Sequence, residues 1–253
     1  MTSLSAFRQN QFVTGRKGFF MNHSKTLEAV VVDAVDNVTN SHGFTGSCSV
    51  AVTSGRENDY MLHPDEARLL APRACATKVT EWTSGRSAAH LALRRLGFIN
   101  PPPVLRGQRG EPLWPEGVVG SITHCYPWTI AITAYGSKQF GIGVDLESLT
   151  RLRGIDISQI TCRGPEFEWI SSGEDFQGRL AMIFSAKEAL YKALYPFYRR
   201  YIDFKEVELN WVPEQSRFEV DFVESFSKNL VQGGCTVHSR RHDSYVFSIC
   251  QVW

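Results

Sequence analysis

The chain has 253 residues, of which 43% are hydrophobic and 21% charged, a composition typical of one large globular domain or two small ones. Its formal net charge of +1 argues against a nucleic-acid-binding protein that relies on bulk positive charge. No apolar run reaches membrane-spanning length, and the polar, basic segment Met1–Asn22 lacks the apolar core of a signal peptide. We therefore predict a cytoplasmic protein that binds neither nucleic acid nor membranes.

The six cysteines are scattered, and no two of them form a Cys-x-x-Cys pair. Zinc sites and disulfide frameworks both show regular cysteine spacing, so this pattern favours reduced cysteines in a cytosolic protein. The positions are Cys48, Cys75, Cys125, Cys162, Cys235 and Cys250.

The N-terminal part of the chain predicts an irregular lead followed by strands and helices. Residues 1–25 carry no clear pattern, whereas the β-branched runs at 27–35 and 47–53 favour strands. A helix is expected over 67–80, interrupted at Pro72, and a second over 84–97. Arg86 would lie in the first turn of that second helix, where a bound phosphate could accept both the backbone N–H groups and the guanidinium.

A proline- and glycine-rich loop over 100–115 carries Arg106 and Arg109 and leads into three strand-like runs. The turns between the runs predict an antiparallel meander. The runs are 118–123, 128–135 and 140–147.

The rest of the chain predicts one long helix followed by strands. Residues 149–175 are polar and irregular with one short helix, and 176–195 form the helix, which Pro196 should stop. Alternating patterns predict strands over 202–211, 218–222, 231–239 and 245–252.

The third run of the meander places two carboxylates on one face of a strand. In Phe140-Gly-Ile-Gly-Val-Asp-Leu-Glu147 the apolar residues alternate with glycines and with Asp145 and Glu147. The two acidic side chains would lie roughly 6.5 Å apart, close enough to reach one cation. The preceding glycines leave room for a group to approach the backbone.

The predicted long helix contains Phe184-Ser-Ala-Lys-Glu-Ala-Leu-Tyr-Lys-Ala-Leu-Tyr-Pro196, in which Glu188 and Lys192 are neighbours on one face and Lys187 lies a step round the helix. Taken alone, Glu188 and Lys192 could be a solvated pair worth about 0.2–0.5 kcal/mol. Three acids that meet in a fold, however, repel one another unless a hard cation such as Mg²⁺ neutralises them. Lysines beside such a site suit a polyphosphate ligand.

His124 and Cys125 are adjacent at the end of a predicted strand. Adjacent residues on a strand point to opposite faces, so the two cannot pair as base and nucleophile. We therefore reject a Cys/His catalytic dyad.

Taken together, these motifs resemble the paired signature of the 4′-phosphopantetheinyl transferases. Gly-Ile-Gly-Val-Asp-Leu-Glu and, about forty residues later, Phe-Ser-Ala-Lys-Glu-Ala-Leu-Tyr-Lys carry the resemblance. Trp114-Pro-Glu-Gly-Val-Val-Gly-Ser-Ile-Thr-His-Cys125 and Gly85-Arg86 are similar to two further blocks of the surfactin-synthesis type, in the branch of the enterobactin synthetase D component. The four blocks run in the family's order from about Leu70 to Pro196.

The resemblance implies an α/β (α+β) fold of two similar lobes related by a pseudo-two-fold axis, each a small, mostly antiparallel sheet packed with a helix. We place the N-terminal lobe, on the nucleotide side, at residues 1–138 and the C-terminal lobe, which carries the magnesium and catalytic residues, at 139–253. Two lobes in one chain would complete the cleft between them, so a monomer is expected.

The implied reaction transfers the 4′-phosphopantetheine arm of coenzyme A to a serine of an apo acyl or peptidyl carrier protein and releases adenosine 3′,5′-bisphosphate. By resemblance, Mg²⁺ is held by Asp145, Glu147 and Glu188, and either Glu188 or Glu147 acting through a water takes the serine proton. Two lysines, Lys187 and Lys192, would face the pyrophosphate. The 3′-phosphate side of the nucleotide would contact Arg86, His124 and one of Arg106 or Arg109, with a hydroxyl or backbone contact from Thr123.

Two other functions remain open. An inactive relative could bind coenzyme A or a carrier protein without transfer, although all three acids and both lysines are present. Another Mg²⁺-dependent phosphotransferase is also conceivable, but the chain has no Gly-x-x-x-x-Gly-Lys-[Ser/Thr] loop.

Overall fold

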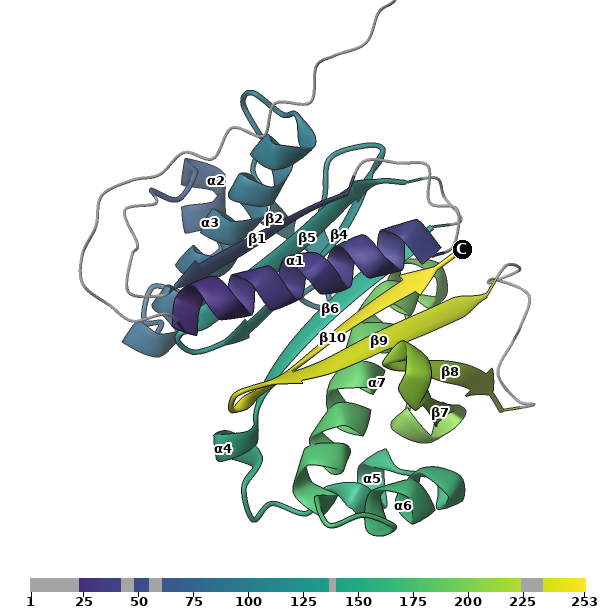
Figure 1. Cartoon of the computed structure of the whole chain (residues 1–253). Helices are drawn as coiled ribbons and strands as arrows, with labels where there is room; N and C mark the ends of the chain where they lie inside the picture. The colour runs from purple at the N-terminus through teal and green to yellow at the C-terminus, as the bar shows by residue number, and fades with distance from the viewer. Residues whose placement is uncertain (1–22, 42–47, 55–60, 137–139, 224–233) are drawn as a thin grey trace, which may run out of the picture.

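Two large antiparallel sheets, each packed on one long helix, form the main body of the computed structural model, and β2 and β3 pair in a small third sheet (Figure 1). It describes the chain except for residues 1–22, 42–47, 55–60, 137–139 and 224–233. The mixed α/β class and the pairing of each sheet with a helix confirm the predicted fold class, whereas the domain boundary near residue 138 stays a prediction.

The first sheet has three strands, and helices cover both of its faces. Its order is β1 (Cys48–Ser54), β5 (Trp128–Tyr135), β4 (Val118–Cys125). The long helix α3 (Ala76–Leu96) packs its alanines on one face, and α1 (His23–Ser41) covers the other. Short elements beside this sheet are α2 (Pro64–Ala67), β2 (Leu105–Arg106) and β3 (Pro112–Leu113).

The second sheet has five strands, in the order β6 (Gly141–Ser148), β10 (Tyr245–Val252), β9 (Cys235–His242), β8 (Arg217–Phe222), β7 (Val207–Val212). The long helix α7 (Phe176–Tyr198) packs on one face, together with α6 (Gly164–Ser171). The remaining elements are α4 (Leu149–Leu152), α5 (Ser158–Thr161) and the 3₁₀ turns η1 (Phe204–Glu206) and η2 (Pro213–Gln215). Where one short helix was predicted over 149–175, the structure has three.

Helix α1 corrects the prediction of a strand over 27–35. Its buried side chains Leu27, Val31, Ala34 and Val35 follow a spacing of four, three and one, which is the stripe of a helix. Helix α1 lies against β1 of the first sheet and against β9 and β10 of the second, so tertiary packing overrides the strand preference of the valines (Figure 1).

Strand β6 corrects the predicted meander. β4 and β5 pair as expected, but β6 pairs with β10, from the end of the chain. On its other edge, two of its amides donate to hydroxyl groups of β4 rather than to a backbone ladder: Val144 N–H to Ser121 Oγ (3.1 Å) and Leu146 N–H to Thr123 Oγ1 (3.3 Å). Side-chain hydroxyls therefore join the two sheets at the strand that carries Asp145.

Helix α7 extends beyond the expected stop at Pro196 and ends at Tyr198, followed by Arg199 in the left-handed conformation. A proline in the last turn removes only one helical hydrogen bond, so the turn is retained. Of the strands after α7, β8 and β10 lie as predicted, whereas the segment 202–211 contains η1 before β7. β9 covers the part of the predicted strand 231–239 from Cys235 onward and continues to His242, and residues 231–233 lie outside the described residues. Among the described residues, no helix combines the length and apolarity needed to span a bilayer.

Candidate active site between strand β6 and helix α7

Asp145 is the centre of the candidate site. Its side chain is buried, and its Oδ1 accepts hydrogen bonds from Lys192 Nζ at 2.7 Å and from Thr123 Oγ1 at 3.2 Å. Lys192 also donates to the carbonyl oxygen of Val144 at 3.0 Å. The bonds of Lys192 tie the last part of α7 to the middle of β6, as the predicted pairing of the two motifs requires.

The alternation predicted for β6 is present. Ile142, Val144 and Leu146 are buried in the core beneath α1, and the opposite face turns toward α7. A methyl group added at Gly141 or Gly143 would overlap the carbonyl oxygen of Ala193 or Ala189 on α7. The group that approaches these glycines is therefore the helix, which brings Glu188 and Lys192 to the acidic strand.

The other two acids are electrostatically coupled to Asp145. Burial and the charge of Asp145 raise the pKa of Glu147 to about 7, with a smaller contribution from Glu188 and partial compensation by Lys192 and Arg151. Burial also raises the pKa of Glu188; Asp145 adds to that rise and Lys192 opposes it. The carboxylates thus concentrate negative charge that one ammonium compensates only in part.

The donor set suits a hard cation. Asp145 Oδ2 is buried and has no hydrogen-bond partner among the described residues, although buried carboxylate oxygens are normally satisfied. Within the same part of the chain, no three His, Cys, Asp or Glu side chains already converge as a ligand set. The unsatisfied oxygen and the coupled carboxylates nevertheless fit the all-oxygen coordination that Mg²⁺ prefers.

Lys187 corrects a predicted role, because it does not face the acids. The side chain is 1% exposed, and its Nζ donates to Glu166 Oε2 (2.8 Å) and to the carbonyl oxygens of Thr161 (2.8 Å), Phe204 (2.7 Å) and Val207 (3.1 Å). An ammonium has three protons, and these four acceptors occupy all of them. Lys187 is therefore not available to a pyrophosphate in this arrangement.

Arg86 is also placed differently from the prediction. Helix α3 begins at Ala76, so Arg86 lies near the middle of the helix and not in its first turn. It is buried, and its guanidinium stacks over the Trp82 ring at 3.8 Å from the centroid. The argument from a helix N-terminus is wrong for this residue, and its contact with coenzyme A stays a prediction.

The side chain of Thr123, on β4, is hydrogen-bonded to strand β6. Its hydroxyl donates to Asp145 and accepts from the Leu146 amide. The donor of this hydroxyl is thus used within the protein, and the predicted hydroxyl or backbone contact of Thr123 with coenzyme A stays a prediction.

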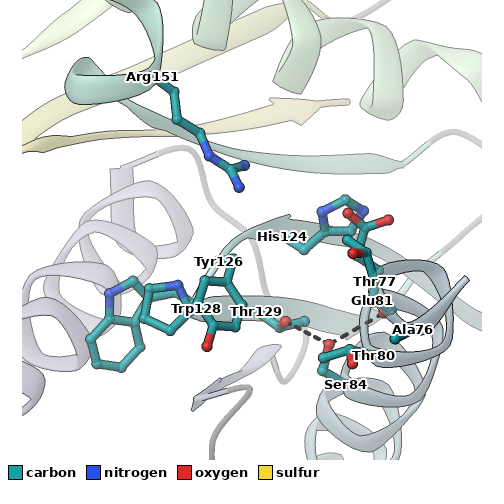
Figure 2. Close-up of a pocket in the computed structure, with 11 residues that line it drawn as sticks. Ala76, Thr77, Thr80, Glu81, Ser84, His124, Tyr126, Trp128, Thr129 and Arg151 are labelled. Carbon is teal, nitrogen blue, oxygen red and sulfur yellow. Dashed lines mark hydrogen bonds between the residues drawn. The ribbon is translucent and has the colours of Figure 1, made fainter.

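A pocket of about 390 Å³ opens beside His124 (Figure 2). Arg151 reaches into it from the C-terminal half, opposite His124 and the N-terminal part of α3. Its floor includes Thr129, whose hydroxyl donates to Ser84 Oγ at 3.0 Å. His124 is exposed and the neighbouring Cys125 is buried, which confirms that the two point to opposite faces. The lining residues are Ala76, Thr77, Thr80, Glu81, Ser84, His124, Tyr126, Pro127, Trp128, Thr129 and Arg151.

The structure separates the two candidate arginines of the loop. Arg106 lies near α3, where its charge opposes the rise that the Glu81 hydrogen bond causes in the pKa of Lys78. Arg109 lies near α7, where its charge opposes the rise that burial causes in the pKa of Tyr191. Arg106 therefore lies near the part of α3 that carries Lys78, and Arg109 lies near the part of α7 that carries Tyr191.

Three charged residues near the site were missed from the sequence. Lys78 donates to Glu81 at 2.8 Å; this bond lowers the pKa of Glu81, and the charges of His124 and Arg151 lower it further. Lys78 and Glu81 were missed because separate helices were expected over 67–80 and 84–97, whereas the single helix α3 carries both residues together with Arg86. For Arg151, the only signal was its position just after the acidic strand.

Comparison with protein families matches two models. Residues 65–134 match the model described as "4′-phosphopantetheinyl transferase N-terminal domain", and residues 141–250 match "4′-phosphopantetheinyl transferase superfamily". The second match covers β6 and α7, and the first covers α3 and His124.

Individual relatives agree with these models. The chain is 32% identical to 4′-phosphopantetheinyl transferase Npt of Nocardia iowensis, covering 69% of this chain and 78% of the relative. It is 34% identical to 4′-phosphopantetheinyl transferase Svp of Streptomyces mobaraensis, covering 73% and 72%. A 33% identity to enterobactin synthase component D of Escherichia coli K12 covers 54% and 64% and supports the predicted branch. Among solved structures, holo-[acyl-carrier-protein] synthase of Neisseria meningitidis aligns with 45% of this chain and 97% of its own, at 20% identity and a TM-score of 0.39.

Proposed function

The chain belongs to the 4′-phosphopantetheinyl transferase superfamily, and from this we propose that it transfers the phosphopantetheine arm of coenzyme A to a serine of an apo acyl or peptidyl carrier protein. The serine oxygen attacks the phosphorus that bears the pantetheine arm. The bond from that phosphorus to the bridging oxygen breaks, and adenosine 3′,5′-bisphosphate leaves with the electron pair. The serine proton passes to a carboxylate of the site.

One observation carries this proposal: the acidic face of β6 and the Glu188–Lys192 face of α7 meet at Asp145. Phosphoryl transfer requires positioned charge more than covalent chemistry from the protein, and this junction gathers three carboxylates and an ammonium. Lys192 would offset negative charge on the pyrophosphate as the leaving phosphate forms.

The residues that would hold Mg²⁺ are Asp145, Glu147 and Glu188, and the unsatisfied Oδ2 of Asp145 supports this assignment. When bound, the metal would neutralise the charge on the pyrophosphate oxygens. Thr123 and Lys192 hold the other oxygen of Asp145, so this carboxylate is oriented before any ligand arrives.

The general base is either Glu188 directly or Glu147 through a water. Both carboxylates are partly buried, and both lie close enough to Asp145 to interact with its charge. Separate substitution of each residue decides between them, as described in the Discussion.

The nucleotide side of the site is proposed to use His124, Arg86 and Arg106. His124 is exposed at the edge of the pocket, and Arg106 lies on the side of α3 that carries Lys78. Arg109 is the alternative to Arg106 from the opposite side of the loop. In this proposal the nucleotide would lie against the proposed N-terminal lobe, residues 1–138, and the metal against the proposed C-terminal lobe, residues 139–253.

The test is incubation of the purified chain with coenzyme A, Mg²⁺ and an apo carrier domain, followed by intact-mass spectrometry. We expect the carrier to gain the mass of one phosphopantetheine arm, and a carrier whose acceptor serine is replaced by alanine to gain nothing. Omission of the metal by chelation should abolish the gain, and its return should restore it. A gain of mass that persists in the chelator would reject the role of Mg²⁺.

Binding of coenzyme A or carrier without any transfer would instead support the inactive relative. Replacing coenzyme A with ATP tests the other phosphotransferase reaction. Sedimentation of the chain and fractionation of the producing cells test the proposed monomer and cytoplasmic location.

A further inference from the structure

Lys187 is a buried cation that the proposed reaction does not use. Its four acceptors lie in four different segments: Thr161 ends α5, Glu166 is in α6, Phe204 is in η1 and Val207 begins β7. A charged side chain is rarely buried this deeply unless each of its donors is paired. One ammonium thus connects α7 to α5, α6, η1 and the start of β7.

The carboxylate that pairs with Lys187 is equally constrained. Glu166 is fully buried; its Oε1 accepts from the Leu209 amide at 2.8 Å, and its Oε2 accepts from the Arg163 amide at 2.6 Å as well as from Lys187. Glu166 is the third residue of α6 and closes the capping box at the start of that helix. Both members of the ion pair are therefore also hydrogen-bonded to backbone groups: Glu166 to two amides and Lys187 to three carbonyl oxygens.

Lys187 immediately precedes Glu188, so the two side chains leave α7 about 100° apart. With Lys187 held on the outer side, Glu188 and Lys192 are turned toward β6. On the inner side, Gly141 and Gly143 allow the backbone of α7 to lie directly on the strand. The Lys187–Glu166 ion pair and the close contact with β6 therefore hold α7 from two sides, and together they fix its rotation about its own axis.

We propose that Lys187 is a positioning residue, whose ion pair with Glu166 sets the rotation of α7 that presents Glu188 and Lys192 to the acidic strand. The inference rests on the proposed function, because it assigns Lys187 an effect on turnover and none on the binding of coenzyme A. It differs from a phosphate-binding role, which would lower the affinity for coenzyme A.

The other lobe provides a matched control. Glu66 is buried in α2, and its Oε1 accepts from His90 Nε2 on α3 and from the Val104 amide, each at 2.8 Å. Its Oε2 accepts from the His63 amide at 3.1 Å, which closes the capping box of α2. This is the same arrangement of a capping glutamate and a long helix, but α3 does not carry the carboxylate base or Lys192.

The experiment compares two double variants that remove both members of each pair, so that no buried charge is left alone. In Lys187→Met/Glu166→Gln, we expect kcat to fall by about tenfold to a hundredfold, as is common when catalytic groups are displaced by about 1 Å. The dissociation constant of coenzyme A, measured by calorimetry, should stay within about twofold. In His90→Met/Glu66→Gln, kcat per folded molecule should stay within about twofold.

Unchanged kcat in the Lys187 variant would overturn the proposal, and so would a loss of coenzyme A affinity at unchanged kcat. If the double variant does not fold, Glu166→Asp keeps both charges but moves the carboxylate away from Lys187 by one methylene group. The same fall in kcat is then expected, with an unchanged affinity for coenzyme A. A wild-type chain that transfers nothing rejects the proposed function instead. The inference is then decided by crystal structures of wild type and variant, in which an unmoved Glu188 carboxylate rejects it.

Discussion

Lys192 Nζ lies 2.7 Å from Asp145 Oδ1, and this bond joins two motifs that are 47 residues apart in the chain. Asp145 is buried, and the ammonium is its only charged partner among the described contacts. The proposed roles in metal binding, proton removal and stabilisation of the leaving phosphate all depend on this junction of β6 and α7.

Asp145→Asn should remove the negative charge while keeping an oxygen that can accept from Thr123 and Lys192. Because this removes a proposed metal ligand and the ion pair of Asp145 with Lys192, we expect transfer to fall by on the order of 10²-fold or more. The measurement is kcat/KM for carrier modification over a range of Mg²⁺ concentrations. Glu219→Gln, at an exposed pair with Arg217 on β8, serves as the control and should be unaffected. Full activity of Asp145→Asn would remove this residue from the centre.

Glu188→Gln and Glu147→Gln distinguish the two candidate bases. Loss of a base or a metal ligand should lower kcat on the order of 10²-fold, whereas Glu168→Gln on the exposed side of α6 should leave it unchanged. The base should show the larger loss in single-turnover experiments at saturating Mg²⁺. Near-normal turnover in a pure Glu188→Gln preparation would exclude Glu188 from the chemistry.

His124→Ala and Arg86→Ala should weaken coenzyme A binding. His124 is exposed at the pocket, so its substitution should leave the melting temperature unchanged while the dissociation constant rises. Arg86 is buried over Trp82, so its loss should also lower the melting temperature. Titration calorimetry with coenzyme A and with its 3′-dephospho form provides the measurement. If either variant binds both ligands as the wild type does, that residue does not contact the 3′-phosphate.

Gly143→Ala should separate α7 from β6, because the new methyl group would overlap the Ala189 carbonyl oxygen. Overpacking of this kind typically costs about 1–3 kcal/mol, so thermal unfolding should shift down and transfer should decline with it. Gly164→Ala is the matched control, since a methyl group there meets nothing within 4 Å. Equal melting temperatures for the two variants would contradict the close approach of the helix to the strand.

Glu66→Gln should change how stability depends on pH. Burial raises the pKa of Glu66, but the hydrogen bonds from His90 and the Val104 amide outweigh it and leave the pKa below 4.5. A carboxyl whose pKa is lower in the folded state stabilises the protein above its unfolded pKa and loses that contribution as the pH falls. The wild type should therefore lose stability faster than Glu66→Gln between about pH 5 and pH 3 in denaturant titrations. If the free energy of unfolding falls in parallel with pH for the wild type and Glu66→Gln, Glu66 does not contribute to the pH dependence of stability.

The sequence alone determined those features that depend on local periodicity. Alternation over 140–147 identified the acidic face of β6, the four-residue step from Glu188 to Lys192 identified one face of α7, and opposite strand faces excluded the His124–Cys125 dyad. These predictions hold because backbone geometry relates neighbouring side chains regardless of what packs on them.

Only the tertiary structure decided which partner each face meets. The valines after Leu27 form a helix because their stripe packs across two sheets, β6 leaves the meander because β10 returns to pair with it, and Lys187 turns inward because Glu166 arrives from α6. Such partners are remote in the chain, and burial free energies gained with them exceed the small differences in local propensity.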